Sequence, residues 1–345
     1  MTLRDVAAEA GVAESTASRA LTGHDSIAEE TRQRIHEIAR RLGYNRRKRP
    51  VKEPGNRRGL VGVVVAALHN SFYPFLIDRI HDELDALGFD MILIIDDLSN
   101  AGNSRKIQGL IDTSLDGVIF ATAVIQSPAV EQLIAREFPT VLAIRSNKAN
   151  NVDVVESDNL AAGAEAVRHL LDLGHERIGF ILGPRETSTS IDRFAGGCRE
   201  LEAVGLAPAP DHVIWGSYSH DGGYSGLVRL MNLAQPPGAI FCGNDVIAIG
   251  ALEACQKLGI DVPGNLSIIG VDDIPMASWS MVSLTTIRQP IGEIGALSAR
   301  RLVTRIEGRA DQIPTHDILP TSIVRRRTTG PASSKPVPLS RLDRV

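Results

Sequence analysis

From residue 60 onward, short continuous apolar runs alternate with segments of helical periodicity. The first run is Leu60–Val65, and the first helical segment after it spans residues 75–87. An uninterrupted apolar run of this length is typical of a parallel strand buried on both faces, and the alternation predicts a parallel α/β fold. The other predicted strands are 91–95, 117–120, 177–182, 239–242 and 266–271, and the other predicted helices are 160–173, 246–258 and 291–306.

This alternating region, residues 60–327, has about 270 residues, which is more than one sheet typically needs. We therefore expect two lobes with a cleft between them. Ligands of parallel α/β folds bind at the carboxyl ends of the strands. The residues that follow the predicted strands are accordingly the first candidates for a binding site.

The first 45 residues, here called the head, have a different pattern. Apolar residues recur at helical spacing from Leu3 to Ala10, and Gly11 ends that helix. Further helices are predicted at 14–21 and 28–42. Two helices joined by a short glycine turn form a helix-turn-helix unit, whose second helix enters the DNA major groove. A plain three-helix bundle with polar residues facing solvent is the alternative interpretation.

Charge is distributed unevenly along the chain. Residues 1–59 hold 13 basic and 8 acidic side chains, whereas residues 60–345 hold 24 basic and 33 acidic ones. Seven of the basic side chains lie between residues 44 and 58. A basic segment on an acidic protein indicates a polyanionic partner, although a solvated linker could have the same composition.

Several other function classes lack support in the sequence. No apolar run approaches the ~20 residues that cross a bilayer, and the N-terminus has no signal-peptide pattern. The three cysteines lie far apart without a CxxC spacing, so we expect a cytoplasmic protein. We find no nucleotide-binding glycine loop, catalytic constellation or metal-ligand cluster, and expect neither an enzyme nor a cofactor. His169 and His175 are interpreted as packing or capping residues.

Residues 2–44, TLRDVAAEAGVAESTASRALTGHDSIAEETRQRIHEIARRLGY, resemble the DNA-binding head of the LacI/GalR (lactose-repressor) family of bacterial transcription regulators. The similarity continues to about residue 327. Its main segments there are VGVVV…NSFYPFLIDRI, LLDLGHERIGFILGP, DRFAGGCREL, AIFCGNDVIAIGALEA and VPGNLSIIGVDDIP…LTTIRQP. The family's effector domain is itself related to periplasmic sugar-binding proteins.

The resemblance implies that the head binds double-stranded operator DNA. The matching positions are Thr2, Leu3, Glu14, Ser15, Thr16, Ser18, Arg19, Thr22, Tyr44 and Arg47. Arg19 is suited to a bidentate guanine contact, while Glu14 could accept a hydrogen bond from cytosine or face away from the DNA. Ala13 and Ala28 stand where the family has helix-capping Ser or Thr. Each lost cap costs ~1 kcal/mol, so we expect a loosely folded head without DNA.

The predicted hinge, residues 46–59, departs further from the family. The family has a short helix here with a leucine inserted in the minor groove, but Glu53 falls at that position and Pro54 follows it. A carboxylate cannot act as an apolar wedge, and proline disfavours a helix at the preceding residue. Val51 is the remaining candidate wedge. We expect an extended basic tether, with backbone charge contributing a larger share of DNA binding than is usual in the family.

The same resemblance implies a set of ligand-binding residues in the cleft. They are Phe72, Tyr73, Arg145, Thr189, Arg193, Tyr218, Asn244, Asp272 and Gln289. A guanidinium and a carboxylate can hold neighbouring hydroxyl groups, while aromatic rings cover the C–H patches of a sugar. Asp272 could instead form a turn or a cap, and Asn244 a helix N-cap. Ile144 stands where the family often has aspartate, which removes one hydroxyl acceptor.

Together these observations predict a small all-α helix-turn-helix head plus an α/β two-lobed periplasmic-binding-protein-like domain with parallel sheets. The predicted boundaries are 1–45 for the head, 46–59 for the hinge, 60–327 for the two lobes and 328–345 for a disordered tail. We expect a homodimeric transcription regulator that acts as a repressor and responds to a small sugar-like effector. The family places the dimer contact on helices of the first lobe such as 75–87. A cytosolic sugar-binding module with a vestigial head is the alternative. The sequence does not specify the effector, the operator or the direction of regulation.

Overall fold

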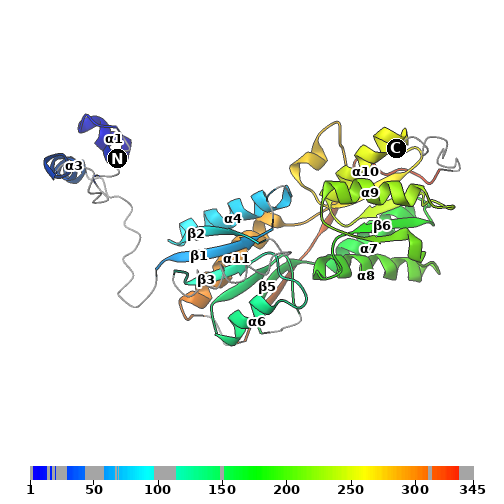
Figure 1. The fold of residues 1–345 in the computed structure, drawn as a ribbon, viewed down its shortest axis with the longest axis horizontal. Coiled ribbons are helices and arrows are strands. Elements are labelled where there is room, and N and C mark those ends of the chain that lie inside the picture. Colours follow the sequence, from blue (N-terminus) through cyan, green and yellow to red (C-terminus); the bar gives the residue numbers. More distant parts are fainter. Residues whose placement is uncertain are drawn as a thin grey trace. The chain divides into compact units, whose positions relative to one another are not determined.

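The computed structural model describes residues 3–13, 16–17, 20, 29–42, 58–66, 68, 70–96, 114–147, 151–309 and 313–333. It divides the chain into two compact units, Met1–Arg57 and Arg58–Val345. We call them the N-terminal unit and the C-terminal unit. Figure 1 shows the fold of each.

The N-terminal unit contains α1 (Leu3–Glu9) and α3 (Glu29–Arg41), close to the first and third predicted helices. Gly11 follows α1 with a φ of 63°, a conformation that glycine adopts without strain. The glutamate at the end of α1, Glu9, forms a 2.6 Å ion pair with Arg41. The two helices share a small core: Val6, Ala7, Ala10, Ala17, Ala20, Ile35 and Ala39. Most of the predicted second helix lies outside the described residues.

The described part of the C-terminal unit contains two six-stranded sheets, one in each lobe. The first lobe has strand order β11-β5-β4-β3-β1-β2, with β1 (Leu60–Val65), β2 (Asp90–Ile95), β3 (Gly117–Phe120), β4 (Thr140–Ala143), β5 (Asp153–Ser157) and β11 (His316–Leu319). The second has order β12-β10-β9-β8-β6-β7, with β6 (Ile178–Leu182), β7 (Val213–Trp215), β8 (Ala239–Cys242), β9 (Ser267–Asp272), β10 (Thr285–Arg288) and β12 (Ser322–Val324). The pairings are parallel, as predicted, except that β12 runs antiparallel to β10.

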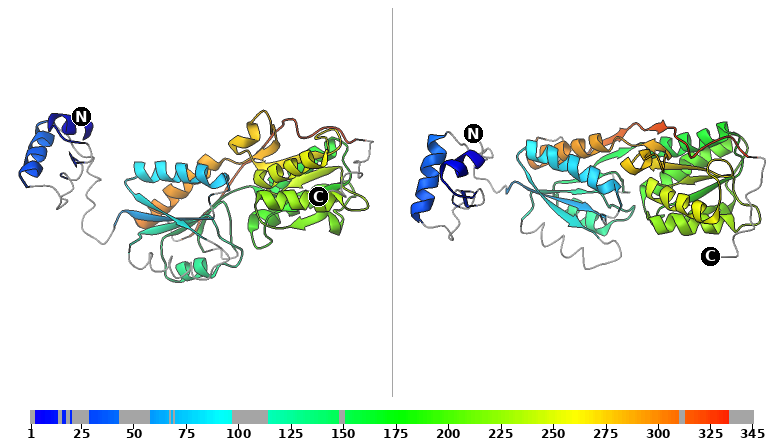
Figure 2. Two further views of the ribbon diagram at one scale, coloured as in Figure 1. Left: turned by 45° about the horizontal axis from the view of Figure 1, so that its top comes forward. Right: turned by 90° about the horizontal axis from the view of Figure 1, so that it is seen from above.

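Helices cover both faces of each sheet (Figures 1 and 2). In the first lobe, α4 (Phe72–Ala86) and α11 (Ile291–Ile306) pack together on one face, and α6 (Pro128–Ala135) packs on the other. In the second lobe, α7 (Asn159–Asp172) and α8 (Ser188–Ala203) form one layer, and α9 (His220–Met231) and α10 (Asp245–Leu258) form the other. The short 3₁₀ helices are η1 (Pro210–His212) and η2 (Pro275–Ser278).

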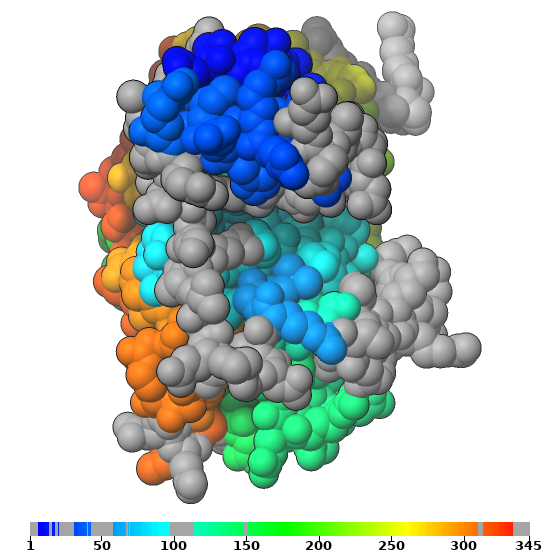
Figure 3. Space-filling view, turned by 90° about the vertical axis from the view of Figure 1, so that its left-hand side faces the viewer, coloured from blue at the N-terminus to red at the C-terminus, as the bar shows by residue number. Residues whose placement is uncertain are grey.

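Each lobe is assembled from segments that are far apart in the sequence. The described chain passes from one lobe to the other after β5, after β10 and after β11. In Figure 3 the surface of the first lobe accordingly combines α4 in cyan, residues near 130 in green and α11 in orange. Three connections, rather than one linker, therefore join the lobes in the described part of the chain.

Two glycines bring α7 and α8 close together. A Cβ atom on Gly163 would overlap the carbonyl oxygen of Arg193, and one on Gly196 would overlap the carbonyl oxygen of Leu160. The two backbones therefore approach more closely than any larger side chain allows. This contact fixes the position of α8, which carries part of the site described below.

Two sequence-based predictions are wrong in part. The predicted disordered tail begins too early, because Thr328 is buried and its hydroxyl donates a 2.7 Å hydrogen bond to the carbonyl of Ile268. The backbone of Ala332 also donates to Leu173. Residues 334–345 lie outside the described residues. Strand β2 is not buried on both faces, since it lies at the edge of its sheet and Leu93 and Ile95 are exposed.

His169 and His175 both make hydrogen bonds within the second lobe, in keeping with the predicted packing role. The Nε2 atom of His169 lies 2.9 Å from the hydroxyl of Thr329, and that of His175 lies 3.0 Å from the carbonyl of Gly330. Burial lowers the pKa of both imidazoles. Within the described part of the chain, no helix is both long and apolar enough to span a membrane.

Candidate functional site

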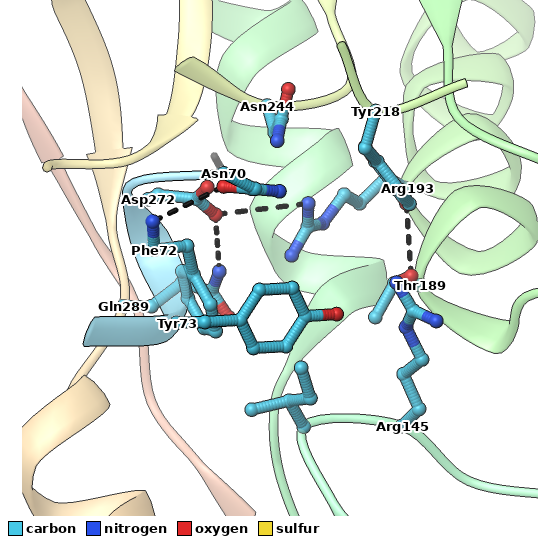
Figure 4. A pocket seen from close by; sticks show the side chains of 11 residues that line it. Asn70, Phe72, Tyr73, Arg145, Thr189, Arg193, Tyr218, Asn244, Asp272 and Gln289 are labelled. Carbon is cyan, nitrogen blue, oxygen red and sulfur yellow. Dashed lines mark hydrogen bonds and ion pairs between the residues drawn. The ribbon is translucent and has the colours of Figure 1, made fainter. Parts of the chain in front are cut away.

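A pocket lies between the two lobes at the carboxyl ends of their strands. It contains about 330 Å³ of empty space, part of which is open to solvent. Figure 4 shows side chains from both lobes that converge on it. The lining residues are Asn70, Phe72, Tyr73, Ile144, Arg145, Thr189, Arg193, Tyr218, Asn244, Asp272 and Gln289.

All nine ligand-binding residues predicted from the sequence line this pocket. The structure thus brings them together, while their contact with a ligand stays a prediction. The prediction missed Asn70, which lies in the loop between β1 and α4 and could have been found from the rule that ligands bind after strand ends. The Asn70 carboxamide oxygen accepts a 3.1 Å hydrogen bond from the backbone amide of Phe72. It therefore orders the loop that opens α4.

The polar centre of the pocket is formed by Arg193, Asp272 and Gln289. The Nη1 atom of Arg193 lies 4.0 Å from Oδ1 of Asp272, and Nε2 of Gln289 donates a 2.6 Å hydrogen bond to the same oxygen. The side chains of Arg193 and Asp272 are each only 4% exposed. Burial raises the pKa of Asp272 to about 8, although the neighbouring guanidinium acts to lower it.

Arg193 is held rigidly by groups that the sequence did not reveal. Its Nε donates a 2.9 Å hydrogen bond to Oδ1 of Asn159, and its Nη1 donates a 2.6 Å bond to the carbonyl of Gly243. Asn159 begins α7 directly after the chain has crossed from the first lobe. The arginine at the centre of the pocket is therefore fixed by the crossover and by the loop after β8.

Asn244 has the capping role that was left open as an alternative. It precedes α10, and its side-chain oxygen accepts a 2.9 Å hydrogen bond from the backbone amide of Ile247. Such a cap satisfies one of the unpaired amides at a helix start. Because the oxygen is used, the Asn244 amide nitrogen is the group left for the pocket.

Two residues that line the pocket have strained backbones. Ile144 has a φ of 63° and Asp272 a φ of 133°, a region that residues with a side chain rarely occupy. Ile144 follows β4 and Asp272 ends β9, so the strain lies at the carboxyl ends of two strands in different lobes. Strain of this kind, costing about 1–3 kcal/mol per residue, clusters at ligand sites.

Aromatic residues form the walls of the pocket. The Tyr218 hydroxyl lies 2.9 Å from that of Thr189 and 2.6 Å from that of Ser190, so the ring is tied to the start of α8. Phe72 and Tyr73 pack edge to face with 5.8 Å between ring centroids. Burial raises the pKa of the Tyr73 hydroxyl. These neutral rings offer apolar faces beside the polar centre.

Arg145 enters the pocket from the loop after β4. Its guanidinium lies over the Tyr218 ring, 5.6 Å from the centroid, and its Nε atom is buried without a hydrogen-bond partner. Ser146, the next residue, donates its backbone N–H to the hydroxyl of Ser188 at 3.0 Å. This bond joins the loop of the first lobe to α8 of the second.

The predicted DNA-binding residues lie largely beyond what the structure describes. Thr16 is helical and partly buried, and its backbone amide donates to the carbonyl of Ala13. Leu3 begins α1. The remaining eight, Thr2, Glu14, Ser15, Ser18, Arg19, Thr22, Tyr44 and Arg47, lie outside the described residues, as do Val51, Glu53 and Pro54 of the predicted hinge. The DNA contacts therefore stay a prediction.

Comparison with known proteins identifies both parts of the chain. Residues 2–47 match the model of bacterial regulatory proteins of the lacI family, and residues 167–329 match that of a periplasmic binding protein-like domain. The chain is 30% identical over 336 residues to the HTH-type transcriptional regulator DegA of Bacillus subtilis, covering 96% of this chain and 99% of DegA. The chain belongs to the LacI family.

Other LacI-family relatives match over similar lengths. The chain is 31% identical over 310 residues to the HTH-type transcriptional repressor CytR of Escherichia coli, covering 89% of this chain and 90% of CytR. The solved complex of the transcriptional regulator CelR with cellobiose has a TM-score of 0.74 and 27% identity, covering 95% of this chain and 99% of CelR. The predicted family and fold class are confirmed, and this LacI-family chain is a DNA-binding transcription regulator.

Proposed function

We propose that this LacI-family regulator is a homodimeric repressor whose affinity for operator DNA is controlled by a small, sugar-like molecule in the pocket between its lobes. The observation that carries the proposal is the convergence of eleven lining residues from both lobes on one pocket. A ligand that contacts both lobes favours one lobe arrangement over others. It can therefore shift the placement of the DNA-binding heads.

The chemistry of the pocket suits a polyol. Arg193 and Asn244 supply N–H donors, and Asp272 and Gln289 supply oxygen acceptors. The rings of Phe72, Tyr73 and Tyr218 supply apolar surface for the C–H patches of a sugar. CelR, the structural neighbour described above, is a complex with cellobiose, and CytR is by name a repressor. Both facts support the proposed ligand class and the proposed direction of regulation.

The homodimer is supported by large apolar side chains on the described surface. Phe75 of α4 and Leu93 and Ile95 of β2 are exposed in the first lobe, and Trp279 and Met281 in the second. Met281 is 88% exposed. Contiguous exposed apolar patches mark interaction surfaces, and the proposal takes these side chains as parts of such a patch. We infer that a second copy of the chain covers this surface, because two heads are needed to read a near-palindromic operator.

As a regulator of transcription the protein would act in the cytoplasm and would bind its ligand without converting it. The relatives are regulators, and the pocket residues include no nucleophile paired with a general base. A coupled turnover assay with ATP and common sugars checks this part of the proposal. Turnover above background would contradict it.

The test of function is operator binding by the full chain. Fragments selected from genomic DNA would be footprinted with wild-type protein and with the Arg19→Ala, Ser15→Ala double variant. We expect a footprint of two half-sites, lost in the double variant and kept in the control Arg199→Gln, which changes an exposed side chain of α8. Equal retention on random and selected fragments would contradict sequence-specific regulation and favour a sugar-binding module.

A further inference from the structure

Arg145 is a buried cation that forms no ion pair with a carboxylate among the described residues, although its charge acts on Asp272 across the pocket and lowers the pKa of that carboxyl. The residue is only 6% exposed, and its Nε has no hydrogen-bond partner. Within the part of the chain that the structure describes, the guanidinium forms no ion pair. Its packing on Tyr218, 5.6 Å from the ring centroid, is the contact that positions it. Burying a charge in this state is unfavourable unless a partner neutralises it.

The carboxyl groups around the pocket are already engaged. Asp272 accepts a hydrogen bond from Gln289 and faces Arg193, and burial raises its pKa to about 8, so it carries a proton for much of the time near neutral pH. The neighbouring Asp273 pairs with two other arginines, one at 2.7 Å and one at 2.6 Å. Glu156 lies 2.7 Å from a histidine of β11.

The pocket therefore has an excess of positive charge. Two guanidinium groups, Arg145 and Arg193, face it, against one carboxyl that burial keeps largely neutral. The two arginines differ in their contacts. Arg193 is held in place by hydrogen bonds to Asn159 and Gly243 and keeps N–H groups of its other amino nitrogen for a ligand, whereas Arg145 makes no hydrogen bond with the described residues and its Nε is buried without a partner.

The backbone at Ile144 determines where the Arg145 side chain points. Ile144 is β-branched, yet it adopts a φ of 63°, and its amide donates a 2.8 Å hydrogen bond to the carbonyl of Val155. The positive φ of Ile144 directs the side chain of Arg145 into the pocket. Figure 4 shows this side chain extending from the loop towards Thr189 and Tyr218. Strain is retained at a position of this kind where it serves a ligand.

We propose that the effector is an acidic sugar, whose carboxylate or phosphate group binds Arg145 while its hydroxyl groups bind Arg193, Asp272 and Asn244. This inference rests on the proposed function and names the chemical class of its ligand. The guanidinium fork can bind either anion through two parallel N–H···O bonds. The anion supplies the missing countercharge of Arg145 and gains bonds that are strengthened by the low local dielectric.

The volume of the pocket limits the size of this ligand. Its 330 Å³ of empty space includes space open to solvent, so the enclosed part of the pocket is smaller than that volume. Two backbone N–H groups of the first lobe donate hydrogen bonds to the second lobe, from Ser146 to the Ser188 hydroxyl and from Ile125 to the Glu186 carbonyl. In this arrangement of the lobes the pocket therefore favours a compact ligand over an oligosaccharide.

Calorimetric titration of the full chain with matched sugars tests the proposal. The three sets are glucose, galactose and mannose, their uronates, and their 6-phosphates. We expect the tightest binder to be a uronate or a phosphate, at least tenfold tighter than its neutral parent. Comparison of the two acidic sets decides between carboxylate and phosphate.

Variants of Arg145 then assign the charge contact. Arg145→Gln should weaken binding of the acidic sugar by about 10- to 100-fold, as expected for losing a charge-assisted hydrogen-bond pair, and should weaken binding of the neutral parent far less. Arg145→Lys should recover part of the loss, and Arg199→Gln should bind as the wild type does. The unfolding temperature of ligand-free Arg145→Gln should equal or exceed that of the wild type, because the substitution removes an unpaired buried charge.

Three outcomes would overturn the proposal: tightest binding by a neutral sugar, no binding by either acidic set, or unchanged affinity for the acid in Arg145→Gln. If a neutral sugar releases the protein from its operator, the inference of an acidic ligand is wrong and the proposed function remains. Loss of sequence-specific DNA binding would instead remove the proposed function itself.

Discussion

The contact between Gly183 and Tyr218 gives the most sharply defined perturbation of the pocket. A Cβ atom on Gly183 would lie 2.5 Å or less from three carbons of the Tyr218 ring. Carbon atoms in contact are ordinarily ~3.5–4.0 Å apart, so Gly183→Ala must move the ring by about 1 Å or more. A shift of that size stretches the Tyr218 hydroxyl beyond bonding distance of Thr189 and Ser190, which now lie at 2.9 and 2.6 Å.

The expected cost follows from those two hydrogen bonds. Each contributes about 0.5–1.5 kcal/mol net, so Gly183→Ala should destabilise the C-terminal unit by roughly 1–3 kcal/mol. For a large domain this lowers the unfolding temperature by roughly 2–10 °C. Gly216→Ala is the matched control, since no atom lies within 4 Å of its Cβ position and it precedes Tyr218 by two residues. We expect its unfolding temperature to stay at the wild-type value.

Thermal unfolding monitored by circular dichroism measures both variants. Tyr218→Phe completes a double-mutant cycle, because it removes the hydroxyl and keeps the ring. In the Gly183→Ala background this second substitution should cost little, since the hydroxyl bonds are already lost. The inferred coupling of this glycine to the aromatic wall is wrong if Gly183→Ala unfolds at the wild-type temperature. It is also wrong if Tyr218→Phe lowers stability by the same amount in both backgrounds.

Four further measurements test other parts of the structure. The folded state keeps a proton on Asp272 up to about pH 8, whereas the unfolded chain releases it near pH 4, so stability should fall as the pH rises between these values. Asp272→Asn should make the unfolding temperature less dependent on pH over this range. An unchanged dependence would contradict the raised pKa. Gly196→Ala should lower the free energy of unfolding by about 3 kcal/mol or more, because α7 and α8 must separate to make room for the methyl group. A denaturant midpoint equal to that of the wild type would refute the close contact. Met281→Asp should shift sedimentation towards monomer, and a persistent dimer would place the interface elsewhere. Operator affinity should fall steeply with salt if the hinge binds mainly through its charge, and a slope equivalent to only two or three phosphates would exclude this.

Much of the architecture could be predicted from the sequence because the strands of the two sheets are continuous apolar runs. The bounds of β1, β8 and α11 agree with the prediction residue by residue. Helix α4 starts three residues earlier than predicted, at Phe72, because Pro74 falls in the first turn of the helix, where its missing N–H is not needed. The local pattern therefore predicted the helix correctly but placed its first residue too late in the chain.

The parts that escaped prediction depend on contacts between residues distant in the sequence. Thr328 is ordered by Ile268 and Thr285, and no periodic pattern in its own segment reveals those partners. Likewise, the exposure of Leu93 follows from the place of β2 at the edge of the sheet, which strand order alone decides. The support of Arg193 by Asn159 depends in the same way on how the crossover meets α8.

The pocket was predictable for a different reason. Nine of its residues were predicted from the resemblance to the family. Most of them lie just after strands, whose carboxyl ends meet at one edge of each sheet, whereas Thr189 and Arg193 lie within α8. The sequence could not show which groups would remain unpaired after folding. Arg145 is recognisable as an unpaired cation only once Asp272, Asp273 and Glu156 are seen to have other partners.

The central claim is that ligand in the pocket and DNA on the heads are coupled. Titrating the ligand into free protein and into protein saturated with operator measures this coupling directly. Linkage requires the ligand affinity to change by the same factor as operator affinity changes on adding ligand, a factor of about 5–150 for a typical coupling of ~1–3 kcal/mol. Equal ligand affinities with and without operator would contradict the account.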